Sequence, residues 1–137
     1  MKFEKTSYFS KLKPFKLELE FGNYYLCEKF VVGELFEGVH LDWDMTKALI
    51  TKIHAYYGKD AKIAYIANRV NAYSIDPQNW KKTEKNYNIL IAGAIVVYNN
   101  SSYINASLEK LFTEKSLKRC LSLTEAIEWV ESLKEFK

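Results

Sequence analysis

The stretch Ile89 to Tyr98, ILIAGAIVVY, is the part of the sequence that decides the fold. It carries no charge and shows no alternation of apolar with polar residues, and asparagines bound it on both sides. β-Branched residues dominate its second half and Gly93 lies within it, which favours a strand buried on both faces over a helix. We therefore expect a central strand with helices on both sides of the sheet.

A second apolar run, Ala61 to Ala67, is reached through a segment with helical periodicity. Parallel strands are commonly joined by such a helical crossover, so residues 61–67 and 89–97 are expected to be adjacent, parallel and central. The short run Leu117 to Cys120 is flanked by basic side chains. This flanking suits an edge strand that must not pair with other chains.

The first quarter of the chain predicts an antiparallel meander. Apolar and polar residues alternate from Phe15 to Phe21, Gly22-Asn23 supplies a turn, and strands over Tyr24 to Glu28 and Phe30 to Phe36 follow. The predicted fold class is therefore α/β, with a mixed sheet in which N-terminal antiparallel strands precede alternating helices and parallel strands. We expect one domain over residues 16–137, preceded by an arm over residues 1–15.

Helices are expected between and after the parallel strands. The first begins at Asp42 as its N-cap and ends at Gly58, the second begins at Pro77 with Asp76 as its N-cap, and the last begins at the capping box Ser122 to Glu125. Another helix follows the polar loop after the central strand. It is expected to bury its apolar residues, which recur at helical spacing: Ile104, Leu108, Leu111 and Phe112.

Composition excludes several classes of protein. The chain has 48% hydrophobic and 27% charged residues, as ordinary globular proteins do. Its longest apolar run, Ile89 to Tyr98, is shorter than the ~18 residues needed to cross a bilayer, so no membrane span is predicted. Residues 1–16 lack the pattern of a secretory signal, and we expect a cytoplasmic protein.

The formal net charge of +3 belongs to the start of the chain. Residues 1–16 carry five lysines and one glutamate, which leaves a charge of −1 for residues 17–137. No nucleic-acid partner is therefore predicted. For the arm we expect a frayed terminus, although its basic and aromatic residues could also contact an anionic surface or a second subunit in a homodimer.

Polar residues follow both central strands, and they form the candidate binding surface. If the strands are adjacent, these residues share one rim at the carboxyl ends of the strands, where α/β sheets bind ligands. Arg69 would supply the fixed charge of this rim. Asn and Ser are also ordinary loop and cap residues, so a purely structural role stays open. The candidate binding residues are Asn68, Arg69, Asn71, Tyr73, Ser74, Asn99, Asn100, Ser101 and Ser102.

The sequence offers no group that predicts catalysis, a metal site or a cofactor. It contains no glycine-rich phosphate loop, no nucleophile elbow and no His-Glu-x-x-His motif. His40 and His54 have no further ligands at metal spacing, and we expect no general base beside either serine cluster. Cys27 and Cys120 are expected to be small buried side chains.

Several stretches resemble the SpoIIAA-like or STAS superfamily, and in particular small stand-alone STAS/SEC14-like domain proteins. They are Glu37 to Trp43, Tyr65 to Arg69 with Tyr73 to Pro77, and Lys118 to Ser122 with Glu125 to Trp129. The resemblance covers residues 16–136 and implies a non-enzymatic regulatory or binding domain. Anti-sigma-factor antagonists of this fold carry a phosphorylatable serine at the helix entry after a central strand. Here that Asp-Ser pattern is missing after Ala67, and Ser74 lies in the same loop but out of position.

The leading hypothesis is a regulatory or protein-interaction module that acts through residues 68–76 and 99–102. It predicts that Arg69→Ala and Asn99→Ala abolish binding of a protein partner without lowering thermal stability. The alternative, also suggested by the resemblance, is a binder of a small apolar or lipid-like ligand between sheet and helices. Trp43, Trp80 and Tyr73 would then line a cavity of roughly a few hundred cubic ångströms.

Overall fold

The computed structural model describes residues 1–136, and its main sheet has six strands in the order β1-β2-β3-β5-β7-β8. β1, β2 and β3 pair in antiparallel fashion, whereas β3, β5, β7 and β8 are parallel. The predicted mixed sheet, with two central parallel strands side by side and the last strand at an edge, is confirmed. The strands are β1 (Phe15–Leu19), β2 (Gly22–Leu26), β3 (Phe30–Leu35), β5 (Ile63–Asn68), β7 (Leu90–Val96) and β8 (Ser116–Cys120).

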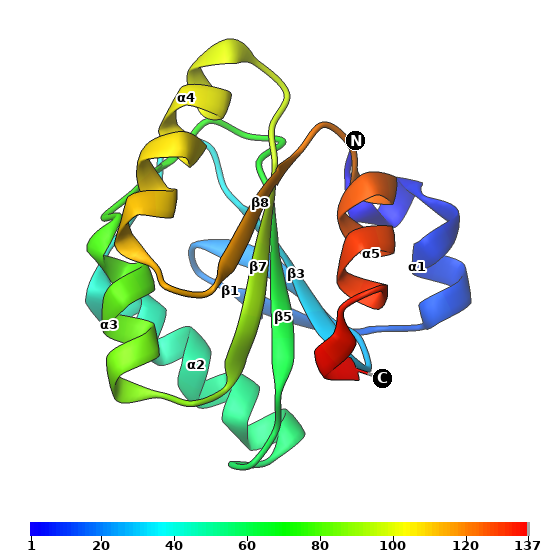
Figure 1. Cartoon of the computed structure of the whole chain (residues 1–137). Helices are drawn as coiled ribbons and strands as arrows, with labels where there is room; N and C mark the ends of the chain where they lie inside the picture. Colours follow the sequence, from blue (N-terminus) through cyan, green and yellow to red (C-terminus); the bar gives the residue numbers. More distant parts are fainter. Residues whose placement is uncertain (137) are drawn as a thin grey trace.

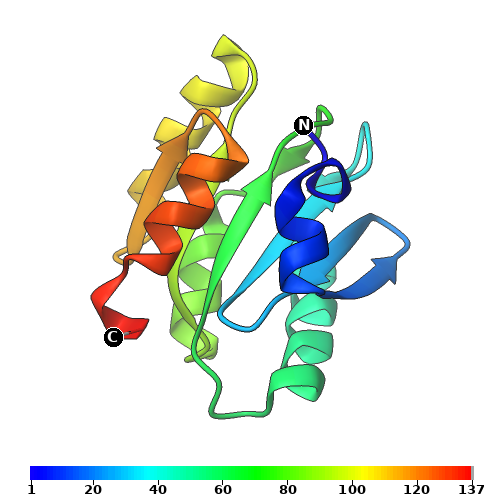
Figure 2. The same cartoon turned by 90° about the vertical axis from the view of Figure 1, so that its right-hand side faces the viewer.

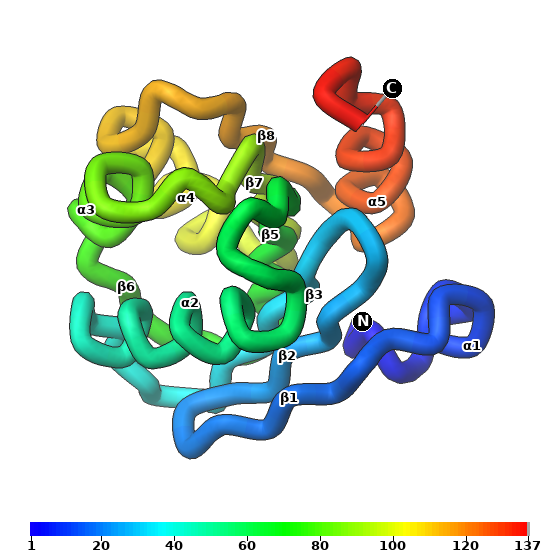
Figure 3. The backbone as a smooth tube through the Cα atoms, turned by 90° about the horizontal axis from the view of Figure 1, so that it is seen from below, coloured from blue at the N-terminus to red at the C-terminus, as the bar shows by residue number. Residues whose placement is uncertain are grey.

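Helices cover both faces of this sheet (Figures 1 and 2). One face carries α2 (Trp43–Tyr57), α3 (Gln78–Asn86) and α4 (Asn100–Glu109), and the other carries α1 (Ser7–Leu12) and α5 (Leu123–Glu131). Figure 3 shows the two helical layers from below, with the strands between them. A second, two-stranded parallel ladder joins β4 (His40–Leu41) to β6 (Ser74–Ile75). Single 3-10 turns are η1 (Phe3–Lys5), η2 (Lys110–Phe112) and η3 (Lys134–Phe136).

The alternation of side chains along each strand divides the core between the two helical layers. Ile66 and Val96 pack with α5 and the N-terminal segment, whereas Ile63 and Ile95 pack under the helices of the opposite face. Because β7 contributes to both layers, its apolar run has no polar alternation. The prediction that β7 is buried on both faces is confirmed for Ala92 to Val96.

The starts of α2 and α5 follow the predicted capping pattern. By contrast, α3 begins at Gln78 with Pro77 at the N-cap position, one residue later than predicted. The backbone N–H of Met45 donates to Asp42 Oδ1 at 2.9 Å, and the N–H of Glu125 donates to Ser122 Oγ at 3.1 Å. The Glu125 carboxylate returns to accept from the N–H of Leu121 at 2.7 Å. Gly58 closes α2 with a φ of +96°.

Both cysteines are buried, as predicted. Burial raises the pKa of the Cys27 thiol to about 12, with the charge of Glu131 acting in the same direction. Burial likewise raises the pKa of Cys120 to about 11. At neutral pH both groups therefore stay thiols, which are poor nucleophiles.

The N-terminal arm is ordered, so the expectation of a frayed terminus is wrong. Phe3 is fully buried in the core beneath the arm, where its ring centroid lies 5.1 Å from that of Tyr25. Residues of α1 add a second, half-buried layer that includes Phe9, whose ring meets Phe3 edge to face at 6.1 Å. The aromatic residues of the arm therefore complete the core on the α5 side of the sheet.

The orientation of α4 also differs from the expectation. Its buried residues are Ala106 and Glu109, whereas Ile104 and Leu108 are more than half exposed. Leu111, in η2, is 78% exposed, and only Phe112 of the expected apolar face packs against the core. The helix is thus rotated so that a carboxylate points inward and aliphatic side chains point to solvent.

Candidate functional site

The polar exits of the two central strands meet at one edge of the sheet, as the sequence predicts. Asn68, at the end of β5, pairs in parallel register with Val96, at the end of β7. Asn99 follows three residues later and starts α4, at the top of Figure 1. Residues 68–74 and 99–102 therefore leave neighbouring strands at the same edge of the sheet.

The candidate binding residues divide by exposure, and they do not form one continuous polar rim. Asn68 is fully buried and Arg69 is 8% exposed, so the expectation that these two offer free polar groups to a partner is wrong. Asn71, Tyr73 and Ser102 are half-buried, and Ser74, Asn99, Asn100 and Ser101 are exposed. The exposed part of the predicted surface is thus the start of α4 together with Ser74.

Arg69 belongs to a buried ion pair on the α4 side of the sheet. Its Nη1 and Nη2 each lie 2.6 Å from one oxygen of the Glu109 carboxylate. Trp80 Nε1 donates to the same carboxylate at 2.9 Å, and Arg69 Nε donates to the Tyr73 hydroxyl at 3.2 Å. Since each charge is paired in a bidentate contact, this cluster fixes structure and leaves no charge for a ligand.

Asn68 belongs to a second cluster on the opposite face, under the N-terminal segment. Its Nδ2 donates to Glu34 Oε2 at 2.7 Å and to the backbone oxygen of Met1 at 2.9 Å. The hydroxyl of Tyr98 donates to Asn68 Oδ1 at 2.6 Å and to Met1 O at 3.2 Å. Burial, and then the charge of Glu34, raises the pKa of Tyr98 to about 12, so the phenol stays a donor at neutral pH.

A histidine does lie beside Ser74, contrary to the expectation that no general base accompanies either serine cluster. The β4–β6 ladder brings His40 Nδ1 to 2.7 Å from Ser74 Oγ. Both residues are exposed, and among residues 1–136 no hydrogen bond orients the second ring nitrogen of His40. The pair thus lacks the third group and the enclosed site that an activated serine needs.

The exposed start of α4 borders a shallow hollow of about 450 Å³. Asn99 caps the helix, accepting from the N–H of Ser102 at 2.8 Å. On the β8 side, the guanidinium of Arg119 stacks over the Tyr103 ring, 4.1 Å from its centroid. The hollow is lined by Val97, Tyr98, Asn99, Asn100, Tyr103 and Leu121.

The outer face of α4 continues from this hollow as an exposed apolar surface. Leu121 is 71% exposed, Leu108 is 55% exposed, and Ile104, Tyr98 and Tyr103 are exposed to lesser degrees. α4 carries no charged residue except the buried Glu109. We call the hollow together with Ile104, Leu108 and Leu111 the α4 surface.

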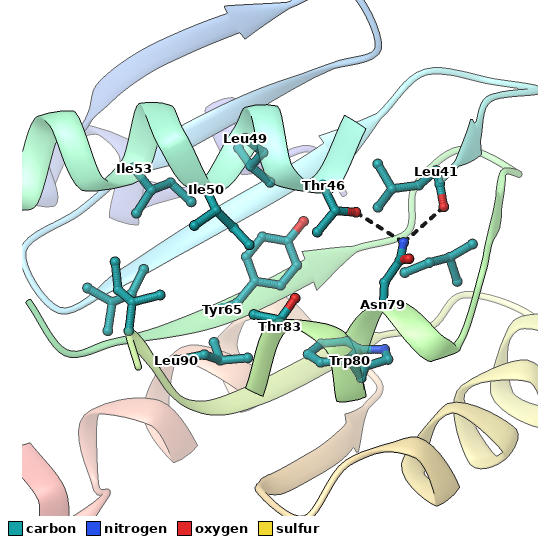
Figure 4. A pocket seen from close by; sticks show the side chains of 13 residues that line it. Leu41, Thr46, Leu49, Ile50, Ile53, Tyr65, Asn79, Trp80, Thr83 and Leu90 are labelled. Carbon is teal, nitrogen blue, oxygen red and sulfur yellow. Dashed lines mark hydrogen bonds between the residues drawn. The ribbon is translucent and has the colours of Figure 1, made fainter. Parts of the chain in front are cut away.

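An apolar cavity of about 80 Å³ lies between the sheet and helices α2 and α3 (Figure 4). Asn79 is the polar residue at one end, where its Nδ2 donates to the Leu41 carbonyl and to Thr46 Oγ1, both at 3.0 Å. Its Oδ1 is buried without a hydrogen-bond partner among residues 1–136. The cavity is smaller than the few hundred cubic ångströms expected for the ligand-binding alternative, and of the three aromatic residues expected there only Trp80 lines it.

Comparisons with known proteins identify the fold. A crystal structure of an uncharacterized protein of the DUF3478 family from Shewanella loihica PV-4, with a SpoIIAA-like fold, superposes with a TM-score of 0.52. The superposition covers 85% of this chain and 91% of that chain, at 12% sequence identity. The chain has a SpoIIAA-like fold. No protein-family model and no curated protein sequence matches the chain.

The SpoIIAA-like fold places the two clusters and the α4 surface around the same end of the sheet. Sequence reasoning missed Glu34, Glu109, Tyr98 and Leu121, which are central to these features. Of these four residues, only Glu109 is recognisable in the sequence, because it is the one charged residue between Asn99 and Lys110. None of the helices within residues 1–136 combines the length and the hydrophobicity that a transmembrane span requires.

Proposed function

We propose that this chain is a non-enzymatic protein-interaction module with a regulatory role, and that its partner docks on the α4 surface. The observation that carries the proposal is the orientation of α4, which turns aliphatic side chains to solvent while it buries a carboxylate. Contiguous apolar patches of several hundred Å² on a small protein commonly mark interaction sites. Tyrosines beside the aliphatic residues, with a polar border at Asn99 to Ser102, match the usual composition of interfaces.

The proposal retains one of the two loops predicted from the sequence and leaves out Asn71, Tyr73 and Ser74 of the other. Residues 99–102 stay in it as its polar border, whereas Asn68 and Arg69 leave it because they are buried. Asn99→Ala is a poor probe of binding, since loss of this N-cap is expected to cost about 1 kcal/mol of stability. A test therefore needs exposed apolar positions that no other residue depends on.

Leu108→Asp is expected to lower affinity for the protein partner at least tenfold, because it places a charge in the centre of the apolar contact. The free energy of unfolding should fall by no more than about 1 kcal/mol, since the side chain is 55% exposed. Ala55→Asp, which adds the same charge to the exposed side of α2, is the matched control. Partners are identified by cross-linking from cell extract, and binding is measured with the purified partner. Equal affinities of the two variants would exclude the α4 surface.

We propose, as a second candidate, a small apolar ligand with one hydrogen-bond donor in the cavity between α2, α3 and the sheet. The unpartnered Asn79 Oδ1 supports it, because an unsatisfied buried acceptor costs about 1–3 kcal/mol that a donor from a ligand would remove. A volume of about 80 Å³ restricts the ligand to a few non-hydrogen atoms, fewer than a lipid has.

Native mass spectrometry of freshly purified protein is expected to show a small added mass if this cavity is occupied. Thr83→Ile, which fills the cavity from α3, should remove that mass and keep or raise the Tm. Short-chain alcohols added to the native protein should raise its Tm by mass action but leave Thr83→Ile unchanged. A bare chain mass together with no alcohol effect on the native protein would exclude this candidate.

A further inference from the structure

The N-terminal segment, residues 1–12, is anchored to the sheet mainly through its first three residues. The backbone N–H of Phe3 donates to Glu34 Oε2 at 2.7 Å, and the backbone oxygen of Met1 accepts from Asn68 and Tyr98. The Phe3 ring is fully buried, whereas α1 contains no fully buried residue. One buried aromatic side chain, a few backbone hydrogen bonds and the half-buried residues Tyr8, Phe9 and Leu12 therefore hold this segment against the core.

Residues of the sheet form the site that binds this segment. Glu34, Asn68 and Tyr98 come from the ends of three neighbouring parallel strands, β3, β5 and β7. We call these three residues the N-terminal slot. Glu34 is 5% exposed and Asn68 is fully buried, and the peptide groups of Met1 and Phe3 complete their hydrogen bonds. Without the bound peptide segment, these buried polar groups would lose hydrogen bonds, and the folded state would be less stable.

The hinge between the segment and β1 is strained. Lys13 has φ +47° and ψ +59°, and it is the only non-glycine residue with a positive φ among residues 1–136. This left-handed conformation is unfavourable for L-residues, and the following Pro14 favours an extended conformation at position 13. An extended Lys13 would carry residues 1–12 away from their own sheet.

We propose that residues 1–12 exchange between two copies of the chain, so that Phe3 of each copy anchors in the N-terminal slot of the other. The same sequence fits the same slot in either arrangement, so the two forms differ mainly at the hinge. A short tether gives the segment an effective concentration on the order of millimolar within its own chain, which favours the closed monomer. Relief of the left-handed conformation favours exchange by roughly tenfold for each hinge. The occupied slot, and not the outer aliphatic face of α4, holds this dimer together.

Two substitutions at Lys13 test the proposal on the full chain. Lys13→Val disfavours the left-handed conformation further, whereas Lys13→Gly adopts it without a steric penalty. The Lys13 side chain is exposed, so neither variant alters the core. Light scattering after size exclusion, over protein concentrations from about 1 µM to 1 mM, measures the dimer; this range brackets the effective concentration of the tether. We expect Lys13→Val to dimerise at a concentration at least tenfold lower than the native chain, and Lys13→Gly at one at least tenfold higher.

Two further measurements distinguish exchange from other dimers. In a mixed dimer of differently isotope-labelled copies, nuclear Overhauser effects are expected between Phe3 of one copy and Tyr25 of the other. The double variant Lys13→Val/Leu108→Asp should dimerise as Lys13→Val does, because exchange does not use α4. A monomeric Lys13→Val at every concentration, equal dimerisation of the two Lys13 variants, or loss of the dimer with Leu108→Asp would each overturn the proposal. The last result would instead assign the dimer to the α4 surface.

Discussion

Glu109→Ala is expected to lower the free energy of unfolding by about 3–5 kcal/mol, because it leaves the Arg69 guanidinium buried without its counter-charge. Both partners are nearly inaccessible, with exposures of 8% for Arg69 and 2% for Glu109. The substitution also removes the acceptor of Trp80 Nε1, which lies 2.9 Å from the carboxylate. Thermal and urea unfolding of the variant and the native chain measure the loss.

The double variant Arg69→Met/Glu109→Leu should recover much of this stability. Removing both charges eliminates the unpaired buried ion, and apolar side chains of similar size fill the space. Lys47→Ala is the matched control, because it removes one partner of the exposed ion pair Lys47–Asp44, in which the charged atoms are 3.2 Å apart. That pair should contribute less than about 1 kcal/mol. If Glu109→Ala lost no more than the control, the cluster would not determine the position of α4.

The same ion pair explains why the sequence predicted α4 with the wrong face inward. Ile104, Leu108 and Leu111 recur at helical spacing, and their burial would yield about 1–2 kcal/mol each beyond their present partial burial. To bury those side chains, α4 would have to turn Glu109 away from Arg69, which would cost about 3–5 kcal/mol. Ala106 would also lose its buried position. The free energy gained by burying the aliphatic side chains and the free energy lost by breaking the ion pair are comparable. Periodicity alone cannot show which of the two is larger, because Arg69 lies forty residues before Glu109 in the chain.

The sheet was predictable because its signals are local. Two predominantly apolar runs separated by helical patterns specify neighbouring parallel strands, and the charged flanks of Leu117 to Cys120 specify an edge. The ordered N-terminal segment was not predictable, because its stability depends on Glu34, Asn68 and Tyr98, which no spacing in the sequence connects. Aromatic residues among lysines are equally compatible with a frayed end until the site that binds their side chains is known.

The fold and the proposed functions therefore depend on different kinds of interaction. Apolar periodicity determines which strands pair, whereas paired polar groups determine which side of α4 faces solvent and whether the N-terminal slot is filled. Substitutions in the polar clusters should consequently alter surfaces and association more than sheet topology.

Alkaline solution is expected to unfold the chain cooperatively as the pH rises above about 10, the ordinary pKa of tyrosine. Burial raises the pKa of Tyr24 and Tyr65 well above this value in the folded protein. Gly33 allows the close approach of both rings, since a Cβ there would lie 2.0 Å from Tyr65 Oη and 2.8 Å from Tyr24 Cε1. The folded state keeps these phenols neutral, whereas the unfolded state ionises them.

The sign of the effect follows from this difference. Because the folded-state pKa values are raised, the stability they contribute is fully present below pH 10 and is lost as the pH rises beyond it. Each of the two tyrosines should remove about 1.4 kcal/mol of unfolding free energy for each pH unit above 10, until its own folded-state pKa is reached. Circular dichroism, recorded against pH, should show one cooperative transition, and tyrosinate absorbance should include a step at the same pH.

Tyr24→Phe is the variant that isolates this contribution. The Tyr24 hydroxyl is buried without a hydrogen-bond partner among residues 1–136, so its removal should keep or raise the stability at pH 7. It should also reduce the loss above pH 10 by about 1.4 kcal/mol per pH unit, which moves the alkaline midpoint upward. An unchanged midpoint would mean that Tyr24 ionises in the folded state, and hence that water reaches the tyrosine cluster at the centre of the sheet.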